Sequence, residues 1–103
     1  MTELERDLFH AIASGNITKV NELIAQGVNV NASSPDLGGC TPLHVAVRRG
    51  MFLLIERLIS AGANVNAKDD DGRTVLYCAG LFYPSALEVL LAAGANPCTL
   101  MYK

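Results

Sequence analysis

Apolar residues recur along the chain at helical spacing, in short runs that come in pairs. Within each run they lie three or four residues apart, which is the period of an amphipathic helix rather than the alternation of a strand. The pattern predicts first helices over Leu4–Ser14, Thr41–Arg49 and Thr74–Leu81, and second helices over Ile17–Gln26, Met51–Ala61 and Ser85–Ala93. We therefore expect paired helices joined by hairpin-like loops.

A repeated motif follows each pair of helices. The segments QGVNVNA, AGANVNA and AGANPCT contain Gly27, Gly62 and Gly94, which are spaced by 35 and 32 residues. A period of this length is typical of solenoids, in which one unit cannot bury its apolar face alone and packs against its neighbours. The chain is therefore expected to form a row of stacked repeats.

The stretch TPLHVAVRRG carries its own start and stop signals. Thr41 is suited to cap a helix and Pro42 to occupy the first helical position, where its missing N–H is not needed. Gly50 allows the left-handed conformation that ends a helix. Isolated helices shorter than about 12–15 residues are marginal in water. This short helix must therefore be held by neighbouring repeats.

The same stretch resembles the ankyrin repeat, which has a period of about 33 residues and a T-P-L-H-x-A pattern. Thr41 to His44 and Ala46 match that pattern, and the resemblance covers nearly the whole chain. It implies an all-α, ankyrin-type solenoid of three stacked helix-turn-helix repeats with hairpin-like loops. We expect one domain over 1–103, with repeats at approximately 4–32, 33–67 and 68–97, and residues 98–103 as the start of an incomplete further hairpin or a tail.

The third repeat departs most from this pattern. Val75 replaces the proline, Tyr77 replaces the histidine, and one residue is missing before the second helix. We therefore expect the third repeat to be the least regular. The loop from Asn31 to Thr41 is longer than the corresponding loop of the next repeat, and we expect it to protrude further.

Composition and charge narrow the classes of partner. Hydrophobic residues make up 50% of the chain and charged residues 17%, so the chain is expected to fold rather than to be disordered. The net charge of −2 favours neither nucleic acid nor a membrane surface as a partner.

The cysteines form no C-x-x-C pair, which is typical of free thiols in a reducing compartment. With an acidic N-terminal segment and no long apolar run, the sequence predicts a cytoplasmic or nuclear protein.

No motif indicates catalysis, a metal or a cofactor. Cys40 and His44 are four residues apart and could share a helix face, but two ligands are too few for a metal site. The resemblance implies instead that His44 is a structural histidine that forms hydrogen bonds with nearby backbone. The run KDDDGR fails as a calcium loop because Ala67 stands where an acid is required. The sequon at Asn16 is better interpreted as a helix cap.

The resemblance implies a non-catalytic protein–protein interaction module that binds a partner protein through loop tips and the concave face of the first helices. Such positions are free to differ between repeats. The corresponding residues are Asp36, Leu37, Cys40, Arg48, Arg49, Lys68, Asp70, Asp71 and Arg73. Arg48 and Arg49 are either a solvated helix end or a hot spot for binding. Together with an acidic tip at Asp69–Asp71, they would form a mixed-charge surface for a complementary peptide or domain.

A structural or assembly role is the alternative. The last pair of helices carries Glu88 as its only charge, whereas a capping repeat needs a polar outer face. Either the chain was cut from a longer array, or its apolar C-terminal face contacts a partner or a second copy of the chain. That end face would include Leu81, Phe82, Tyr83, Leu87 and Leu91. The resemblance also implies that Asn31 and Asn66 are candidate sites of hydroxylation.

Overall fold

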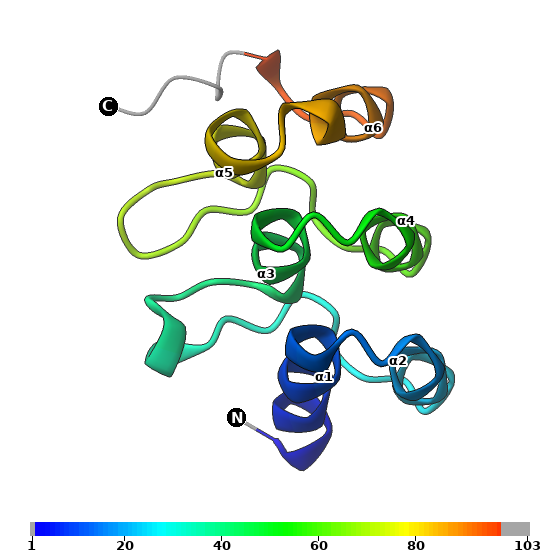
Figure 1. Cartoon of the computed structure of the whole chain (residues 1–103). Helices are drawn as coiled ribbons and strands as arrows, with labels where there is room; N and C mark the ends of the chain where they lie inside the picture. The colour runs from blue at the N-terminus through cyan, green and yellow to red at the C-terminus, as the bar shows by residue number, and fades with distance from the viewer. Residues whose placement is uncertain (1, 98–103) are drawn as a thin grey trace.

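The computed structural model describes residues 2–97, which form three pairs of antiparallel helices stacked in a row (Figure 1). The predicted all-α solenoid is therefore confirmed. The first helices are α1 (Glu3–Ser14), α3 (Pro42–Arg48) and α5 (Val75–Phe82), and the second helices are α2 (Ile17–Ala25), α4 (Phe52–Ser60) and α6 (Leu87–Ala92). Two short 3₁₀ turns, η1 (Pro35–Leu37) and η2 (Pro84–Ala86), complete the described elements.

The helices form two layers. In Figure 1, α1, α3 and α5 form one column and α2, α4 and α6 form the other, with the long loops projecting from the side of the first column. Helix α3 packs against both α1 and α5, and α2 packs against α4. Isolated antiparallel bridges, Ser34 with Cys40 and Lys68 with Thr74, close the two loops as hairpins. The hairpin tips and the first helices consequently share one side of the molecule.

Threonine starts each of the first helices. The hydroxyls of Thr2, Thr41 and Thr74 accept hydrogen bonds from the backbone N–H three residues later, so each satisfies one amide that the helix leaves unpaired. Asn16 caps α2 in the same way by accepting from the Lys19 N–H at 3.1 Å, which confirms its predicted role.

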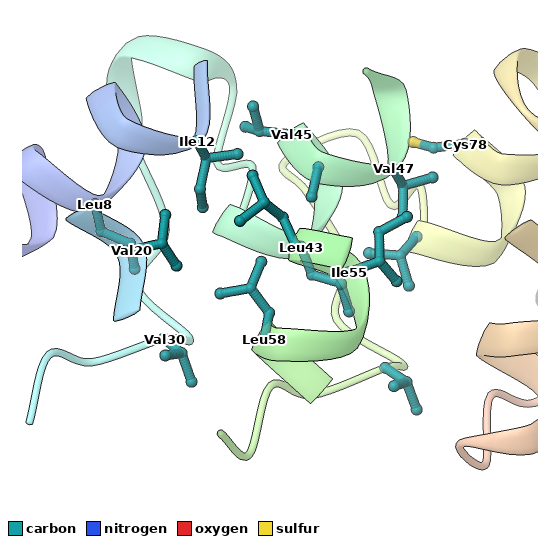
Figure 2. Close-up of a cluster of buried hydrophobic side chains, with 14 of the residues drawn as sticks. Leu8, Ile12, Val20, Val30, Leu43, Val45, Val47, Ile55, Leu58 and Cys78 are labelled. Atoms are coloured by element: carbon teal, nitrogen blue, oxygen red, sulfur yellow. The ribbon is translucent and has the colours of Figure 1, made fainter. Parts of the chain in front are cut away.

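The apolar core runs between the two columns and through every repeat. Figure 2 shows Leu43 of α3 lying between Ile12 of α1 and Ile55 of α4. All three side chains are fully buried, as is Leu58. Truncating a buried leucine or isoleucine to alanine typically costs about 2–5 kcal/mol of folding stability. The short helix α3 is therefore held mainly by packing on both of its neighbours, as its length predicts.

Asparagine side chains tie each loop to the loop that follows. Asn31 Oδ1 accepts from the Asn64 N–H at 2.7 Å, and Asn31 Nδ2 donates to the Gly62 carbonyl at 3.2 Å. One repeat later, Asn66 Oδ1 accepts from the Asn96 N–H at 2.8 Å. These bonds set the register between successive repeats at the end of the second helices. Both candidate hydroxylation sites thus have a structural role, and their modification stays a prediction.

The third repeat is the least regular, as predicted. In the first two repeats the paired helices are joined through Gly15 and Gly50, which have φ values of 73° and 65°. In the third repeat Tyr83, with φ of −143°, follows α5 directly, and η2 leads into α6. The Tyr83 ring lies against Gly50 of the preceding repeat, where a Cβ atom would be 2.5 Å from Tyr83 Cε1. Tyr83 therefore covers the turn between α3 and α4.

The first hairpin has the larger tip. The Ser34 N–H donates to the Cys40 carbonyl at 2.9 Å and encloses residues 35–39, whereas the Asp69 N–H donates to the Arg73 carbonyl at 2.9 Å and encloses residues 70–72. The two additional residues are accommodated by η1, which is followed by Gly38 in the left-handed conformation. The extra length of this loop is therefore coiled within the tip.

Candidate protein-binding surface

The two hairpin tips lie next to each other and expose most of the predicted contact residues. Asp36 and Leu37 are exposed in η1, and Lys68, Asp70 and Asp71 are exposed in the second hairpin. The Asp70 N–H donates to the Gly38 carbonyl at 2.9 Å, and the Asp70 side chain packs directly on Gly39. The tips consequently form one continuous polar edge rather than two independent loops.

Asp69 does not belong to the acidic tip, contrary to the prediction that grouped it with Asp70 and Asp71. Its side chain is only 3% exposed, because Asp69 Oδ1 accepts from the Asp71 and Arg73 N–H groups at 2.9 Å each. These bonds shape the hairpin turn from inside. The acidic tip therefore consists of Asp70 and Asp71, and Asp69 is a structural residue.

Cys40 was predicted to contact a partner, and the structure corrects this. The residue is 1% exposed because the backbone bridge to Ser34 turns it inward. Burial raises the pKa of the Cys40 thiol, although Arg48 opposes the shift, and burial likewise raises the pKa of Cys78. Both side chains therefore stay protonated at neutral pH, and neither presents a reactive thiolate to a ligand.

Arg48 and Arg49 differ in their surroundings. The Arg48 guanidinium lies beside the thiols of Cys40 and Cys78, and its Nη2 lies 3.8 Å from Asp69 Oδ2. The Arg48 side chain remains 34% exposed, so it links the second and third repeats while keeping one edge in solvent. Arg49 is exposed at the end of α3. Of the two arginines, Arg49 has more of its surface open to a partner.

His44 is a buried structural residue, as predicted. Its Nε2 lies 2.9 Å from the Arg73 carbonyl and its Nδ1 accepts from the Thr41 N–H at 3.2 Å. Because a carbonyl can only accept, the neutral ring carries its proton on Nε2. Burial lowers the pKa of His44, although the bond to the Arg73 carbonyl opposes the shift. The histidine thus joins α3 to the second hairpin.

Within residues 2–97, no group of three metal-ligating side chains could hold a metal ion.

A hollow of about 430 Å³ lies where the second hairpin meets the first helices. Its walls are Arg48, Arg73, Tyr77, Cys78, Leu81 and Phe82. The structure thus brings together residues predicted for the partner surface, Arg48 and Arg73, with residues predicted for the end face, Leu81 and Phe82. Sequence reasoning missed Tyr77 and Cys78. Their position three or four residues before Leu81 on α5 is the signal that could have placed them on the same face.

The remaining residues predicted for the end face have different surroundings. Leu91 of α6 is 42% exposed, whereas Leu87 is half-buried and packs against the core. Tyr83 is 40% exposed but presents one side of its ring to Gly50. Leu81 and Phe82, at 60% and 54%, are the most exposed of the five.

Comparison with known proteins identifies the architecture. A family model described as ankyrin repeats, in three copies, matches residues 8–100. The chain belongs to the ankyrin repeat family. Ankyrin repeats are generally protein–protein interaction modules, and proteins of the family typically act without catalysis.

Two curated ankyrin repeat proteins resemble the chain. The ANK repeat-containing protein nipk-1 of Caenorhabditis elegans is 34% identical over 107 aligned residues, which cover 90% of this chain and 18% of that protein. The putative ankyrin repeat protein FPV223 of Fowlpox virus is 44% identical over 50 residues, which cover 48% of this chain and 34% of that protein. The chain thus spans about a third or less of the length of these relatives.

Within residues 2–97, no helix is long and apolar enough to cross a membrane.

Proposed function

We propose that the chain binds a partner protein through the hairpin tips and the hollow between α3 and α5. The observation that carries the proposal is the position of Leu81 and Phe82, which are more than half exposed yet line a hollow with two arginines. The hollow adjoins the second hairpin, because Arg73 at the base of that hairpin lines it. A partner segment lying along this side would contact both features.

The residues around the hollow suit a mixed apolar and polar interface. Removing a leucine or phenylalanine side chain from water is worth about 1.5–3 kcal/mol. Arginine and aromatic residues are enriched among the hot spots of protein interfaces. Around them, Arg49 and Lys68 supply positive charge and Asp70 and Asp71 supply negative charge. The partner is therefore expected to insert an apolar side chain into the hollow and to place charged groups of both signs along the tips.

The test is affinity capture followed by measurement with the purified partner. Proteins from a lysate of the source organism are captured on the wild-type chain and on the double variant Leu81→Ser/Phe82→Ser. Leu53→Ser is the matched control, because Leu53 is 64% exposed on a different face. A partner of this surface should bind the control as it binds the wild type. It should bind the double variant at least about tenfold more weakly, since 1.4 kcal/mol corresponds to tenfold.

The single variant Arg49→Ala tests the end of α3 separately from the hollow. Because Arg49 is exposed, this change should leave the stability of the fold within about 0.5 kcal/mol. Weaker binding by Arg49→Ala would extend the site onto the end of α3. Captured proteins that bind the wild type, Leu81→Ser/Phe82→Ser and Arg49→Ala with equal affinity would refute the proposed site.

Self-association through the third repeat is the second candidate function. It is supported by the exposure of Leu81, Phe82 and Leu91, at 60%, 54% and 42%. Sedimentation velocity at low micromolar concentration should then detect a dimer that dissociates in the variant Leu91→Ser. A monomer at every concentration up to about 100 μM would refute this function, because a stable homodimer has a dissociation constant well below that concentration.

The cytoplasm or the nucleus is the proposed location. Free thiols at Cys40 and Cys78 support it, since free thiols persist in reducing compartments. Imaging of the tagged chain in its source cell is the direct test, and secretion of the chain would contradict the proposal.

A further inference from the structure

A second group of exposed apolar side chains lies far from the hairpin tips. Ile17 and Phe52 begin α2 and α4, and Leu53 follows Phe52; they are 38%, 38% and 64% exposed. The hairpins connect the ends of the second helices to the starts of the first helices. The starts of α2 and α4 lie at the opposite end of each pair, beside Gly15 and Gly50. This apolar group therefore lies away from the hairpin tips, and its hollow shares no lining residue with the hollow that contains Leu81 and Phe82.

These side chains form the apolar end of a groove between α2 and α4. A hollow of about 440 Å³ is lined by Gly15, Ile17, Met51, Phe52, Leu53 and Leu54. An adjoining hollow of about 310 Å³ shares Ile17 and Leu53 with it and extends to Asn21 and Arg57. A third hollow, of about 250 Å³, shares Asn21 and Arg57 with the second and reaches Ala61. Shared walls make these three hollows one groove that follows the length of the helices.

Comparison of the repeats indicates that the apolar end is not required by the fold. With the spacing of the loop glycines, Leu53 corresponds to Thr18 in the first repeat and to Ser85 in the third. Both equivalents are polar and exposed. Leu53 buries little of its surface, so it contributes little to the core. A solenoid carries its specific function on positions that its repeats do not share.

The other end of the groove is polar and offers hydrogen-bond donors. Arg57 Nε donates to Asn21 Oδ1 at 2.7 Å, which turns the Asn21 amide nitrogen away from that bond. Within residues 2–97, Arg57 makes no ion pair and the Asn21 amide nitrogen makes no hydrogen bond. Both are donors, and a carboxylate supplies the complementary acceptors. Glu56 lines the middle hollow together with Asn21 and Arg57, but it does not line the hollow that reaches Ala61. An acid that accepts from these two donors is therefore best placed at the Ala61 end of the groove.

The spacing of these features fits one turn of helix. Leu53 and Arg57 are four residues apart on α4, which corresponds to about 6 Å along the helix axis. The groove extends over α4, whose 9 residues span about 13 Å. An amphipathic helix in a groove presents its anchoring side chains at the same spacing, three or four residues apart.

We propose that the groove between α2 and α4 binds a short amphipathic helix of a partner protein. The helix places two apolar side chains, three or four residues apart, against Ile17, Phe52 and Leu53. About one turn further along, an aspartate or glutamate of the same helix accepts hydrogen bonds from Arg57 and Asn21. The chain would thereby hold two proteins at once, one on each side.

The test uses a display library of 14-residue helix-forming peptides, randomised along one face and panned on the intact chain. Enriched peptides should carry two apolar residues followed, about one turn later, by an acidic residue. Nuclear magnetic resonance titration with a synthetic enriched peptide should shift the amide signals of α2 and α4 and leave those of the hairpin tips unchanged.

Three variants identify the contacts. Leu53→Ser should weaken peptide binding at least tenfold. Arg57→Gln should weaken binding about fivefold for the acidic peptide, and should have no effect on the same peptide with its acid changed to the amide. Leu81→Ser is the matched control, because Leu81 is similarly exposed on the other surface, and it should bind the peptide as the wild type does.

Each alternative occupant gives a different result. Enriched peptides that lose affinity with Leu81→Ser but not with Leu53→Ser would assign them to the hairpin side and overturn the proposal. Self-association that disappears in Leu53→Ser would make a second copy the occupant and also overturn it. A library with no enrichment above background would do the same. Unfolding curves of the variants, measured alongside, establish that each binding effect arises from a folded protein.

Discussion

The contact between Gly50 and Tyr83 yields a quantitative prediction about how the third repeat packs on the second. Gly50 has φ of 65°, and a Cβ at this position would lie 2.5 Å from Tyr83 Cε1 and 2.6 Å from Cζ. Carbon atoms that are not bonded do not approach this closely. The variant Gly50→Ala must therefore displace the tyrosine ring or shift the backbone between α3 and α4.

Gly38 provides a matched control for the backbone contribution. Its φ is 66°, and a Cβ there would have no other atom within 4 Å. A left-handed alanine costs about 1–2 kcal/mol, and lower entropy of the unfolded chain offsets about 0.4–1 kcal/mol of this. Gly38→Ala should therefore cost about 1 kcal/mol. Gly50→Ala carries the same cost plus about 1–3 kcal/mol for overpacking, which gives about 2–4 kcal/mol.

A double-mutant cycle measured by urea unfolding isolates the ring contact. In the background of Tyr83→Ala, the cost of Gly50→Ala should fall to about that of Gly38→Ala, so the coupling free energy should be about 1–3 kcal/mol. Tyr83→Ala should leave the cost of Gly38→Ala unchanged. Equal costs for Gly38→Ala and Gly50→Ala, with no coupling to Tyr83, would refute the assignment of Tyr83 as the cover of this turn.

The remaining predictions concern caps, loop ties and pH. Asn16→Ala should lower the unfolding free energy by about 1 kcal/mol, because the Lys19 N–H loses its acceptor; urea titration measures this, and no change would contradict the cap. Asn66→Ala should cost about 1 kcal/mol and speed hydrogen exchange at the Asn96 amide, whereas unaltered exchange there would argue against the tie. Burial lowers the pKa of His44 in the folded protein. As the pH falls, the imidazole is therefore protonated in the unfolded chain before it is protonated in the folded chain. The free energy of unfolding should then decrease as the pH drops through about 6.5 and below. For one proton, the free energy of unfolding changes by at most about 1.4 kcal/mol per pH unit. Urea unfolding at pH 7.5 and 5.5 should therefore show a smaller loss of unfolding free energy in His44→Gln than in the wild type. Equal losses in the two proteins would contradict the prediction.

Local signals in the sequence accounted for the helices and their starts. Thr41 caps the helix through one hydrogen bond, whereas Pro42 and Gly50 act through their backbone angles. Their effects can therefore be predicted from neighbouring residues alone. The role of His44 could be predicted in kind, but its acceptor, the Arg73 carbonyl, lies 29 residues away. The fold and its caps are thus encoded locally, whereas the partners of buried polar groups depend on how repeats stack.

The candidate site was harder to predict because it is assembled across repeats. Cys40 and Asp69 stand in polar loops, and only the closing of each hairpin turns their side chains inward. Leu81 was assigned to an end face, since nothing in the sequence indicates that α5 and the second hairpin enclose a hollow with Arg48. Burial in a loop and the walls of a hollow are properties of the packed chain, and short-range patterns do not report them.

Hydrogen–deuterium exchange of the chain, alone and with its captured partner, tests the central claim most directly. If the hairpin tips and the hollow form the binding site, partner addition should slow exchange in residues 35–40, 68–74 and 77–82, and the protection should disappear in Leu81→Ser/Phe82→Ser. Protection confined to other parts of the chain, or protection that survives in the double variant, would contradict the claim.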